Sequence, residues 1–528
     1  MRSFVKPTLY SVPSIGTKAT GFTQAYRNIK CLTDNEGQIQ GTFRLFPTAI
    51  TLRDLFDQMV DFYYSYPMFG TPLENKTMEW YTYGEFGELV KGTSAGLLKQ
   101  GVKMGDIVGV LSEISVFFPL AQWSIAYMGG VMFPIDPSYN TNIIYQTLYV
   151  FKIPILICTI KTFNIISQIY LANPTGKLTK IFLFCDDNEV EHLKDDLMSP
   201  LETQLGIPII ALPTLLESKP PNEDIEFPTI LATSPCVLNV GAGRCGNLNP
   251  STLSHSNLIA AGAGFSSCGY NFGRDVYLPT MPMCRAFERS MQLAVFAHGG
   301  CVSFVDGPIV EAMQIARPTI VSFTGETIKA LAEALIEKAQ KSNFFVRLFY
   351  DCGFSIAAQA KEGKTSISWL VQTLILDSFR ERVGGRLKVV FSTCTFLQPR
   401  FQHAIRTMLQ IPVLQCYGTT ETGGVICCQE IDDDSVANVG PPISCCEIRI
   451  RDFVESRQRV ADNNPGEILV RGPNLFSEYH KNKEFTRNAI LEDGWFATGD
   501  IGKILPNGSL EITDTIQDWR KRKNSSKK

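Results

Sequence analysis

The chain lacks a strong excess of either charge, since 49 Lys and Arg residues oppose 52 Asp and Glu residues and leave a net charge of −3. No global electrostatic field therefore favours nucleic acid or a membrane surface as a partner. Internal repeats and low-complexity segments are also missing, and an apolar content of 45% excludes a disordered protein. The 528 residues are enough for several hydrophobic cores, in about three or four domains or in one large enzyme body.

Cysteines with the spacing of a metal site are absent as well. The fifteen cysteines are scattered, and the adjacent pairs Cys427-Cys428 and Cys445-Cys446 cannot both ligate as a CxxC knuckle does. No secretory hydrophobic segment follows Met1. We therefore expect a reducing, cytoplasmic compartment, in which the thiols act as small buried hydrophobic groups.

An uninterrupted membrane-spanning run is missing too. The longest apolar stretch, Val108 to Ile135, has the length to cross a bilayer, but Glu113, Pro119, Gly129 and Gly130 interrupt it. We therefore predict a strand, a helix and a second strand inside a soluble core.

Short apolar strands alternate with amphipathic helices along the chain. Residues 1–44 show no sustained periodicity, so we expect an extended lead-in there. Apolar residues then recur at helical spacing from Thr51 to Tyr66, and a turn precedes a predicted strand from Ile107 to Leu111. The alternation predicts an α/β body with parallel strands.

A polar turn, Tyr417 to Gly424, follows the apolar run Ile411 to Leu414, which we predict to be a buried strand. Tyr417 offers an aromatic face for a purine, Thr419 and Thr420 offer hydroxyls for phosphate oxygens, and Glu421 offers a carboxylate for Mg²⁺. This set predicts a nucleotide site. A polar hairpin turn is the alternative, because Gly, Thr and Glu are ordinary loop residues.

The order of residues in this turn resembles the adenine-binding motif of the adenylate-forming enzymes. WYTYGEF from Trp80, GVKMGDIVGVL from Gly101 and GGVMFPIDPSY from Gly129 resemble the opening of the long-chain acyl-CoA synthetases of that family. The resemblance implies a nucleotide site that includes Tyr417, Gly418 and Thr419. It also implies catalytic roles for Thr420 and Glu421, with Glu421 as the ligand for Mg²⁺.

A glycine-rich string, Gly241, Gly243 and Gly246 in the order GxGxxG, follows the apolar run Cys236 to Val240. It would indicate a dinucleotide-binding fold only if a helix opened directly on its glycines, and Pro250 argues against that. The better match comes later: Ser254-His255-Ser256-Asn257-Leu258 resembles the helix start that follows the phosphate loop of the adenylate-forming enzymes.

That register puts unusual residues in the phosphate loop. Gly241, Ala242, Arg244 and Cys245 stand where the family has hydroxyls, and Asn249 stands where it has lysine. The resemblance implies that the glycines let backbone N–H groups approach phosphate and that Arg244 supplies a cation for catalysis. The alternative is a flexible loop that has lost ATP chemistry, because adenylation brings a carboxylate against an anionic phosphate and needs hydroxyls and cations.

The segment from Met281 to Arg289 resembles the synthetase motif LPLAHxFER, which lines the acyl pocket. The resemblance implies that Met283, Arg285 and Phe287 line that pocket, with Arg285 in place of the family's histidine. Further on, Thr393 and Cys394 occupy the loop that in the family lays its backbone on the adenine. We expect a β-branched side chain to resist the close approach that glycine permits.

The segment Asp493-Gly494-Trp495-Phe496-Ala497-Thr498-Gly499-Asp500 also matches the family, and the resemblance implies that Asp500 holds the ribose hydroxyls. A Gly-Asp turn between strands is the alternative. After Asp514 the family has a hinge and a mobile lid, whereas this sequence stops at Lys528. We expect residues 515–528 to be a solvated basic tail in place of the lid, with lipid or nucleic-acid contact as the less favoured interpretation.

These observations predict an α/β fold: the large N-terminal domain of an adenylate-forming enzyme over residues 45–514, with two α/β sheet layers and a smaller β-rich subdomain. By resemblance the function is long-chain fatty acid-CoA ligation with ATP, Mg²⁺ and CoA, in an impaired form. The alternatives are a non-catalytic nucleotide- or acyl-binding protein and a truncated gene product. The expected partners are small-molecule substrates and no nucleic acid. Peripheral contact with the endoplasmic reticulum membrane is an alternative to a purely cytoplasmic location.

Overall fold

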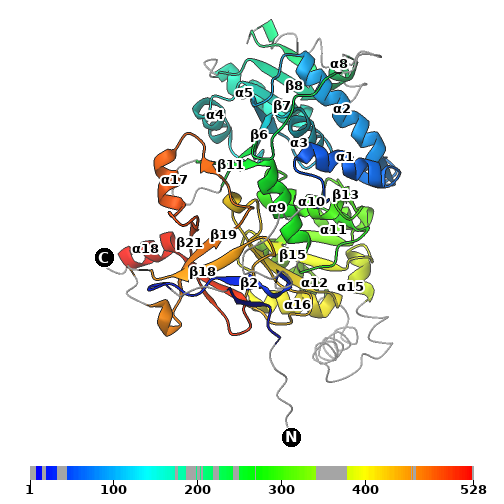
Figure 1. The fold of residues 1–528 in the computed structure, drawn as a ribbon. Coiled ribbons are helices and arrows are strands. Elements are labelled where there is room, and N and C mark those ends of the chain that lie inside the picture. Colours follow the sequence, from blue (N-terminus) through cyan, green and yellow to red (C-terminus); the bar gives the residue numbers. More distant parts are fainter. Residues whose placement is uncertain are drawn as a thin grey trace.

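The computed structural model describes residues 8–14, 19–31, 45–172, 177–185, 198, 202–203, 206–217, 225–241, 249–267, 269–340, 377–453, 455 and 459–525. Within these residues the chain forms two eight-stranded sheets and one six-stranded sheet. Helices pack against the two larger sheets, and the six-stranded sheet lies at the lower left of the view, near the C-terminus and beside the second large sheet (Figure 1). The predicted α/β fold is confirmed.

The first α/β layer has six parallel strands, from β10 to β9 at one edge, and two further strands at the other edge, where β11 is antiparallel to β10 and β20 is antiparallel to β11. Its strands, in spatial order, are β20 (Glu478–Tyr479), β11 (Pro250–Ser254), β10 (Pro235–Val240), β6 (Val131–Ile135), β5 (Ile107–Leu111), β7 (Ile155–Thr159), β8 (Lys180–Phe184) and β9 (Ile209–Ala211). The apolar stretch from Val108 to Ile135 forms β5, a helix and β6, as predicted.

The second α/β layer also has a parallel centre, from β16 to β3, with an antiparallel strand at each edge. Its strands, in spatial order, are β17 (Cys427–Cys428), β16 (Val413–Tyr417), β15 (Val389–Thr393), β14 (Ile320–Thr324), β12 (Val276–Leu278), β13 (Cys301–Ser303), β3 (Pro67–Pro72) and β4 (Met78–Thr82). The polar turn at Tyr417 therefore lies at the carboxyl edge of a parallel sheet, where α/β folds bind ligands.

The third sheet is antiparallel throughout. Its strands are β1 (Ser11–Pro13), β2 (Tyr26–Asn28), β18 (Glu447–Arg451), β19 (Gly466–Arg471), β21 (Phe496–Ile504) and β22 (Leu510–Thr515). Arg27 forms a buried ion pair with Glu447, and the Asn28 side chain donates to the Pro442 carbonyl at 3.0 Å. The described part of the expected lead-in is therefore paired with strands from the end of the chain.

Some helices begin where the sequence supplies a cap, and α1 is an example. The Thr51 hydroxyl accepts from the Asp54 N–H and the Asp54 carboxylate accepts from the Thr51 N–H, so the predicted helix starts at Leu52 and ends at Tyr63. The helices are α1 (Leu52–Tyr63), α2 (Tyr83–Lys99), α3 (Phe117–Met128), α4 (Thr141–Val150), α5 (Ile160–Ala172), α8 (Leu212–Glu217), α9 (His255–Ser266), α10 (Ala286–Phe296), α11 (Ile309–Ala316), α12 (Gly325–Gln340), α15 (Asp377–Arg382), α16 (Pro399–Leu409), α17 (Lys483–Ala489) and α18 (Ile516–Ser525), with 3₁₀ turns η1 (Ile29–Cys31), η4 (Thr420–Thr422) and η6 (Val460–Asp462).

The helices α9 and α10 lie between the two α/β layers and contact each other (Figure 1). A Ser254–Asn257 capping box opens α9, which begins at His255 after the strand β11. The GxGxxG string is therefore not a helix start, because β11 stands between it and α9. The dinucleotide-binding alternative does not hold.

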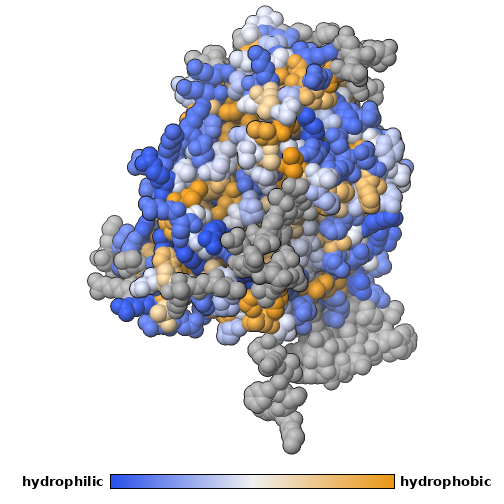
Figure 2. All heavy atoms as spheres, viewed as in Figure 1, coloured by the Kyte–Doolittle hydropathy of each residue, from blue (hydrophilic) through white to orange (hydrophobic). Residues whose placement is uncertain are grey.

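No helix among the described residues has the length and apolar content to cross a bilayer. On the face drawn in Figure 2, hydrophobic side chains occur in several separate groups between hydrophilic ones. Isolated groups of this kind are normal on protein surfaces.

Candidate functional site

A large cleft with a volume of about 1750 Å³ lies at the carboxyl ends of β15 and β16. The opposite wall comes from the six-stranded sheet, through β18, β19 and β21, and from α18. Predicted site residues that line it are Gly241, Arg285, Phe287, Thr393, Cys394, Tyr417, Gly418, Thr419, Thr420, Glu421 and Asp500. The structure therefore brings together residues that are far apart in the sequence.

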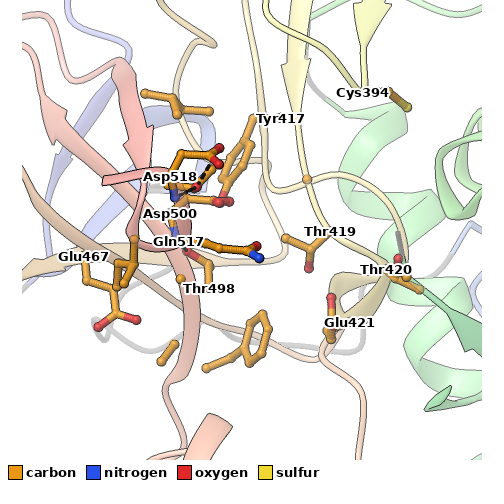
Figure 3. A pocket seen from close by; sticks show the side chains of 18 of the residues that line it. Cys394, Tyr417, Thr419, Thr420, Glu421, Glu467, Thr498, Asp500, Gln517 and Asp518 are labelled. Carbon is orange, nitrogen blue, oxygen red and sulfur yellow. Dashed lines mark hydrogen bonds between the residues drawn. The ribbon is translucent and has the colours of Figure 1, made fainter. Parts of the chain in front are cut away.

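The decisive geometry in this cleft joins Tyr417 to Asp500. The Tyr417 hydroxyl donates a hydrogen bond to Asp500 Oδ2 at 2.5 Å, from β16 to β21 across the cleft wall (Figure 3). Both residues are buried, so the bond fixes the orientation of the ring. A carboxylate has about four acceptor positions, so one hydrogen bond leaves it the capacity to receive a hydroxyl donor.

The turn after Tyr417 holds its carboxylate and hydroxyls in place. The Thr419 N–H donates to the Thr422 hydroxyl at 3.3 Å, and that hydroxyl donates to the Thr419 carbonyl at 3.0 Å. The Thr419 hydroxyl oxygen is buried without a hydrogen-bond partner in the described chain. Tyr479 donates to Glu421 Oε1 at 2.9 Å. The Glu421 carboxylate is thus oriented by a hydroxyl from β20.

Gly241 lies against this turn. A Cβ added there would meet Thr420 Oγ1 at 3.2 Å, so the residue after β10 approaches the turn closely. Residues 242–248 lie outside the described residues, so the predicted roles of Gly243, Arg244 and Gly246 stay predictions. Asn249, where the family has lysine, also lines the cleft, and its Oδ1 accepts from the Asn482 side chain at 2.9 Å.

The loop that follows β15 reaches the cleft despite its bulky residues. Cys394 has a φ of 68°, a left-handed conformation that normally favours glycine, and its Sγ lies 3.8 Å from Met281 Sδ. Thr395 accepts from the Gly325 N–H at 2.8 Å, which ties the loop to α12. The backbone therefore takes a glycine-like course, and Phe396, 68% exposed, lines the cleft beside it.

The expected acyl-pocket residues have different locations. Phe287 and Arg285 line the cleft at the start of α10, and Arg285 forms an ion pair with the buried Asp136 at 3.1 Å. Met283 does not line it: the side chain is 2% exposed in the core, where Gln292 Nε2 lies 3.7 Å from its sulfur. The turn before α10 directs Met283 into the core, and its expected role in the acyl pocket stays a prediction.

The segment expected as a basic tail folds into α18 over residues 516–525. The Trp519 ring packs edge-on against Phe453 at 4.9 Å, and Arg520 pairs with Glu455. In Figure 3 the Gln517 side chain points into the cleft toward Thr419. The helix thus contributes directly to the cleft wall.

A model of the AMP-binding enzyme family matches residues 68–480 of the chain. The chain belongs to this family. Long chain acyl-CoA synthetase 6, peroxisomal, from Arabidopsis thaliana is 27% identical over 521 residues, which are 96% of this chain and 71% of the relative. Fatty acyl-CoA synthetase A from Dictyostelium discoideum is 28% identical over 83% of this chain and 64% of the relative.

Solved structures of the AMP-binding family share the fold. The A domain of carboxylic acid reductase from Segniliparus rugosus, solved in complex with AMP and a co-purified carboxylic acid, has a TM-score of 0.71 at 16% identity and covers 90% of this chain and 76% of its own. A long-chain-fatty-acid-CoA ligase from Archaeoglobus fulgidus has a TM-score of 0.67 at 17% identity, over 89% and 84% of the two chains. The expected large domain of the adenylate-forming fold is confirmed.

Several charged side chains that line the cleft form ion pairs with one another. Arg451 pairs with Glu467, Arg520 with Glu455, and Lys521 with Asp518 at 3.1 Å. No group of three or more His, Cys, Asp or Glu residues that could hold a metal occurs in the described part of the chain.

Sequence reasoning missed several cleft residues. Tyr479 lies in β20, Gln517 in α18 and Phe396 in the loop after β15, and nothing in the local sequence of Tyr479 or Gln517 marks them. Phe396 directly follows the matched loop at Cys394, which is a usable signal. Tyr479 lies 58 residues after Glu421 and reaches it only because β20 joins β11.

Glu288→Gln is expected to flatten the pH dependence of the free energy of unfolding. Burial raises the pKa of Glu288 from an ordinary 4.5 to about 8, although Tyr277 and Ser322 donate hydrogen bonds to it at 2.7 and 3.0 Å. Because the pKa is higher in the folded state than in the unfolded state, the contribution of Glu288 to the free energy of unfolding is greatest below pH 4.5. It declines by about 1.4 kcal/mol per pH unit until the pH passes about 8. Urea denaturation across this range measures the slope.

The control for this slope is the exposed Glu333→Gln on α12, which should leave it unchanged. An equal slope in the parent protein and Glu288→Gln would show that another group controls the pH dependence.

Proposed function

We propose that the chain activates long-chain fatty acids for thioester formation. A carboxylate oxygen of the fatty acid attacks the α-phosphorus of ATP and pyrophosphate leaves, which gives an acyl adenylate. The sulfur of CoA then attacks the acyl carbonyl carbon and AMP leaves. The observation that carries this proposal is the Tyr417–Asp500 hydrogen bond in the same cleft as the Thr419–Glu421 turn. The fatty acyl-CoA synthetase names of the relatives support the substrate class.

The positions of these residues in the cleft support the following proposed roles. The fixed Tyr417 ring offers a flat face to adenine, and the Asp500 carboxylate accepts from the ribose hydroxyls. The hydroxyls of Thr419 and Thr420 face the phosphates, and Glu421 would hold Mg²⁺ against them. Bound there, Mg²⁺ would neutralise phosphate oxygens during attack by an anionic carboxylate.

We propose that the acyl group enters past Phe287, because this ring lines the cleft at the start of α10. Arg285 does not offer a simple anion site, since Asp136 already pairs with it. We also propose residues 45–514 as the catalytic body, with β1 and β2 as an added edge of its small sheet.

Asp500→Asn is expected to raise the KM for ATP about 10–100-fold, because a charge-assisted hydrogen bond to a ribose hydroxyl contributes about 1.5–3 kcal/mol. Isothermal titration or initial-rate kinetics at varied ATP measures the change. The matched control is Tyr417→Phe, which removes the 2.5 Å hydrogen bond but keeps both the ring and the carboxylate. It should change the KM less than Asp500→Asn does. Equal effects of the two substitutions would refute a direct role of Asp500 in ribose binding.

Fatty acid-dependent exchange of pyrophosphate into ATP tests the reaction itself. Exchange that requires both ATP and a long-chain fatty acid supports the ligase. A non-catalytic binding protein is the second candidate, and Asn249 favours it, because this cleft position carries a neutral amide engaged by Asn482. Silence in the exchange assay, together with a higher melting temperature on adding ATP, would favour the binding protein.

A further inference from the structure

Two cysteines face each other directly beside the adenine-facing residue. Cys416 is the residue before Tyr417 on β16, and it pairs in antiparallel register with Cys428 on β17. Their Sγ atoms are 3.5 Å apart. In this register Cys427 lies opposite Tyr417, and its side chain therefore points to the other face of the strand pair. Cys428 is the partner of Cys416.

The backbone geometry suits a covalent bond between these two thiols. The Gln429 N–H donates to the Gln415 carbonyl at 3.0 Å, and the Cys428 N–H donates to Pro441 instead of to Cys416. Cys416 and Cys428 therefore form a non-hydrogen-bonded pair, whose Cα atoms are typically about 4.5 Å apart. This separation lies inside the range of about 4.4–6.8 Å that disulfides span.

The surroundings of the two thiols differ in a way that assigns them different roles. Cys416 is 7% exposed and lines the cleft, so a small oxidant can reach it from there. Cys428 is fully buried, and a Cβ on Gly269 would come within 2.7 Å of its sulfur. No space exists beside Cys428 for a bulky adduct. The neighbouring thiol of Cys446 is directed to the Ile426 carbonyl at 3.4 Å.

We propose that Cys416 and Cys428 are an oxidation site, in which Cys416 reacts with hydrogen peroxide in the cleft and Cys428 resolves the product as a reversible disulfide. The Cys416 thiolate sulfur attacks a peroxide oxygen, the O–O bond breaks, and a sulfenic acid and water form. The Cys428 thiolate then displaces hydroxide from that sulfur, the S–S bond forms, and a second water leaves. Two thiols are oxidised by two electrons and one hydrogen peroxide is reduced to two waters. This site does not depend on the proposed ligase activity.

The test is peptide mapping of the full chain after treatment with hydrogen peroxide and alkylation. The expected result for the parent protein is one peptide pair that joins Cys416 to Cys428, lighter by two hydrogen atoms and released by dithiothreitol. In Cys428→Ser, which lacks the resolving thiol, Cys416 should instead gain two or three oxygens that dithiothreitol cannot remove. Cys301→Ser, buried in β13 away from the pair, should behave like the parent protein.

The mapping on the parent protein alone keeps the proposal falsifiable if Cys428→Ser fails to fold. Quantitative alkylation of both Cys416 and Cys428 after peroxide treatment would overturn the proposal. A disulfide from either cysteine to another thiol would overturn it as well, and so would reversible oxidation of Cys416 in Cys428→Ser.

Discussion

Glu421→Gln is expected to lower the fatty acid-dependent rate of AMP formation about 10²–10³-fold, with little change in melting temperature. Adenylation drives a carboxylate onto an anionic phosphate, so the loss of the ligand for the neutralising cation raises the barrier. The glutamine has nearly the same size as the glutamate. In the parent protein the Tyr479 hydroxyl donates to Glu421 Oε1 at 2.9 Å, and the glutamine amide oxygen can accept the same hydrogen bond. Initial rates at saturating ATP and fatty acid measure kcat.

The matched control for Glu421 is Tyr479→Phe. This substitution removes the hydroxyl that orients the carboxylate and leaves the carboxylate itself, so a loss of less than about tenfold is expected. A Glu421→Gln variant that keeps its kcat within about twofold would remove Glu421 from the reaction. Equal losses in the two variants would assign the effect to positioning rather than to the negative charge.

The elements of the fold could be predicted where local signals agreed with tertiary packing. The cap at Thr51 and the apolar spacing that follows it predict α1, because the same side chains both start the helix and bury its face. The interruptions between Val108 and Ile135 predict β5, α3 and β6 for the same reason. In contrast, the lead-in carries no periodicity, since β1 and β2 are three residues each. They pair with each other, and β2 also pairs with β18, more than 400 positions away.

The candidate site also contains residues that the local sequence predicts and residues that it does not. The turn at Tyr417 is a local sequence feature, so its hydroxyls and carboxylate could be predicted from residue types. Its contact with Asp500 spans 83 positions and follows from the family resemblance, because spacing alone does not show which strands meet. The acyl-pocket role of Met283 stays a prediction, because a motif gives residue order but not the direction of each side chain. Phe396 and Gln517 were missed because exposed residues of the cleft wall leave no periodic signal.

Gly418→Ala is expected to lower the free energy of unfolding by about 3–5 kcal/mol and to abolish any rise in melting temperature on adding ATP. A Cβ at this position would overlap the Gly424 carbonyl oxygen, and it would lie 2.6 Å from the Gly424 carbonyl carbon and 2.7 Å from Val425 Cα. These are backbone atoms, so no side-chain rotation relieves the clash. Urea denaturation measures the stability, and thermal denaturation with and without ATP measures the binding.

Gly273→Ala is the control for Gly418→Ala, since a Cβ there meets no heavy atom within 4 Å and the residue does not have a positive φ. It should change the free energy of unfolding by no more than about 1 kcal/mol, because alanine mainly reduces the freedom of the unfolded chain. The difference in stability between the two variants measures the effect of the close approach of Gly418 to Gly424. In the turn, the Gly424 N–H donates a hydrogen bond to the Thr419 carbonyl at 3.1 Å. Forcing this turn open would separate Glu421 from Tyr417 and Asp500. Equal stability of the two variants would mean that the turn tolerates opening, and its fixed geometry could then no longer explain how the cleft holds a nucleotide.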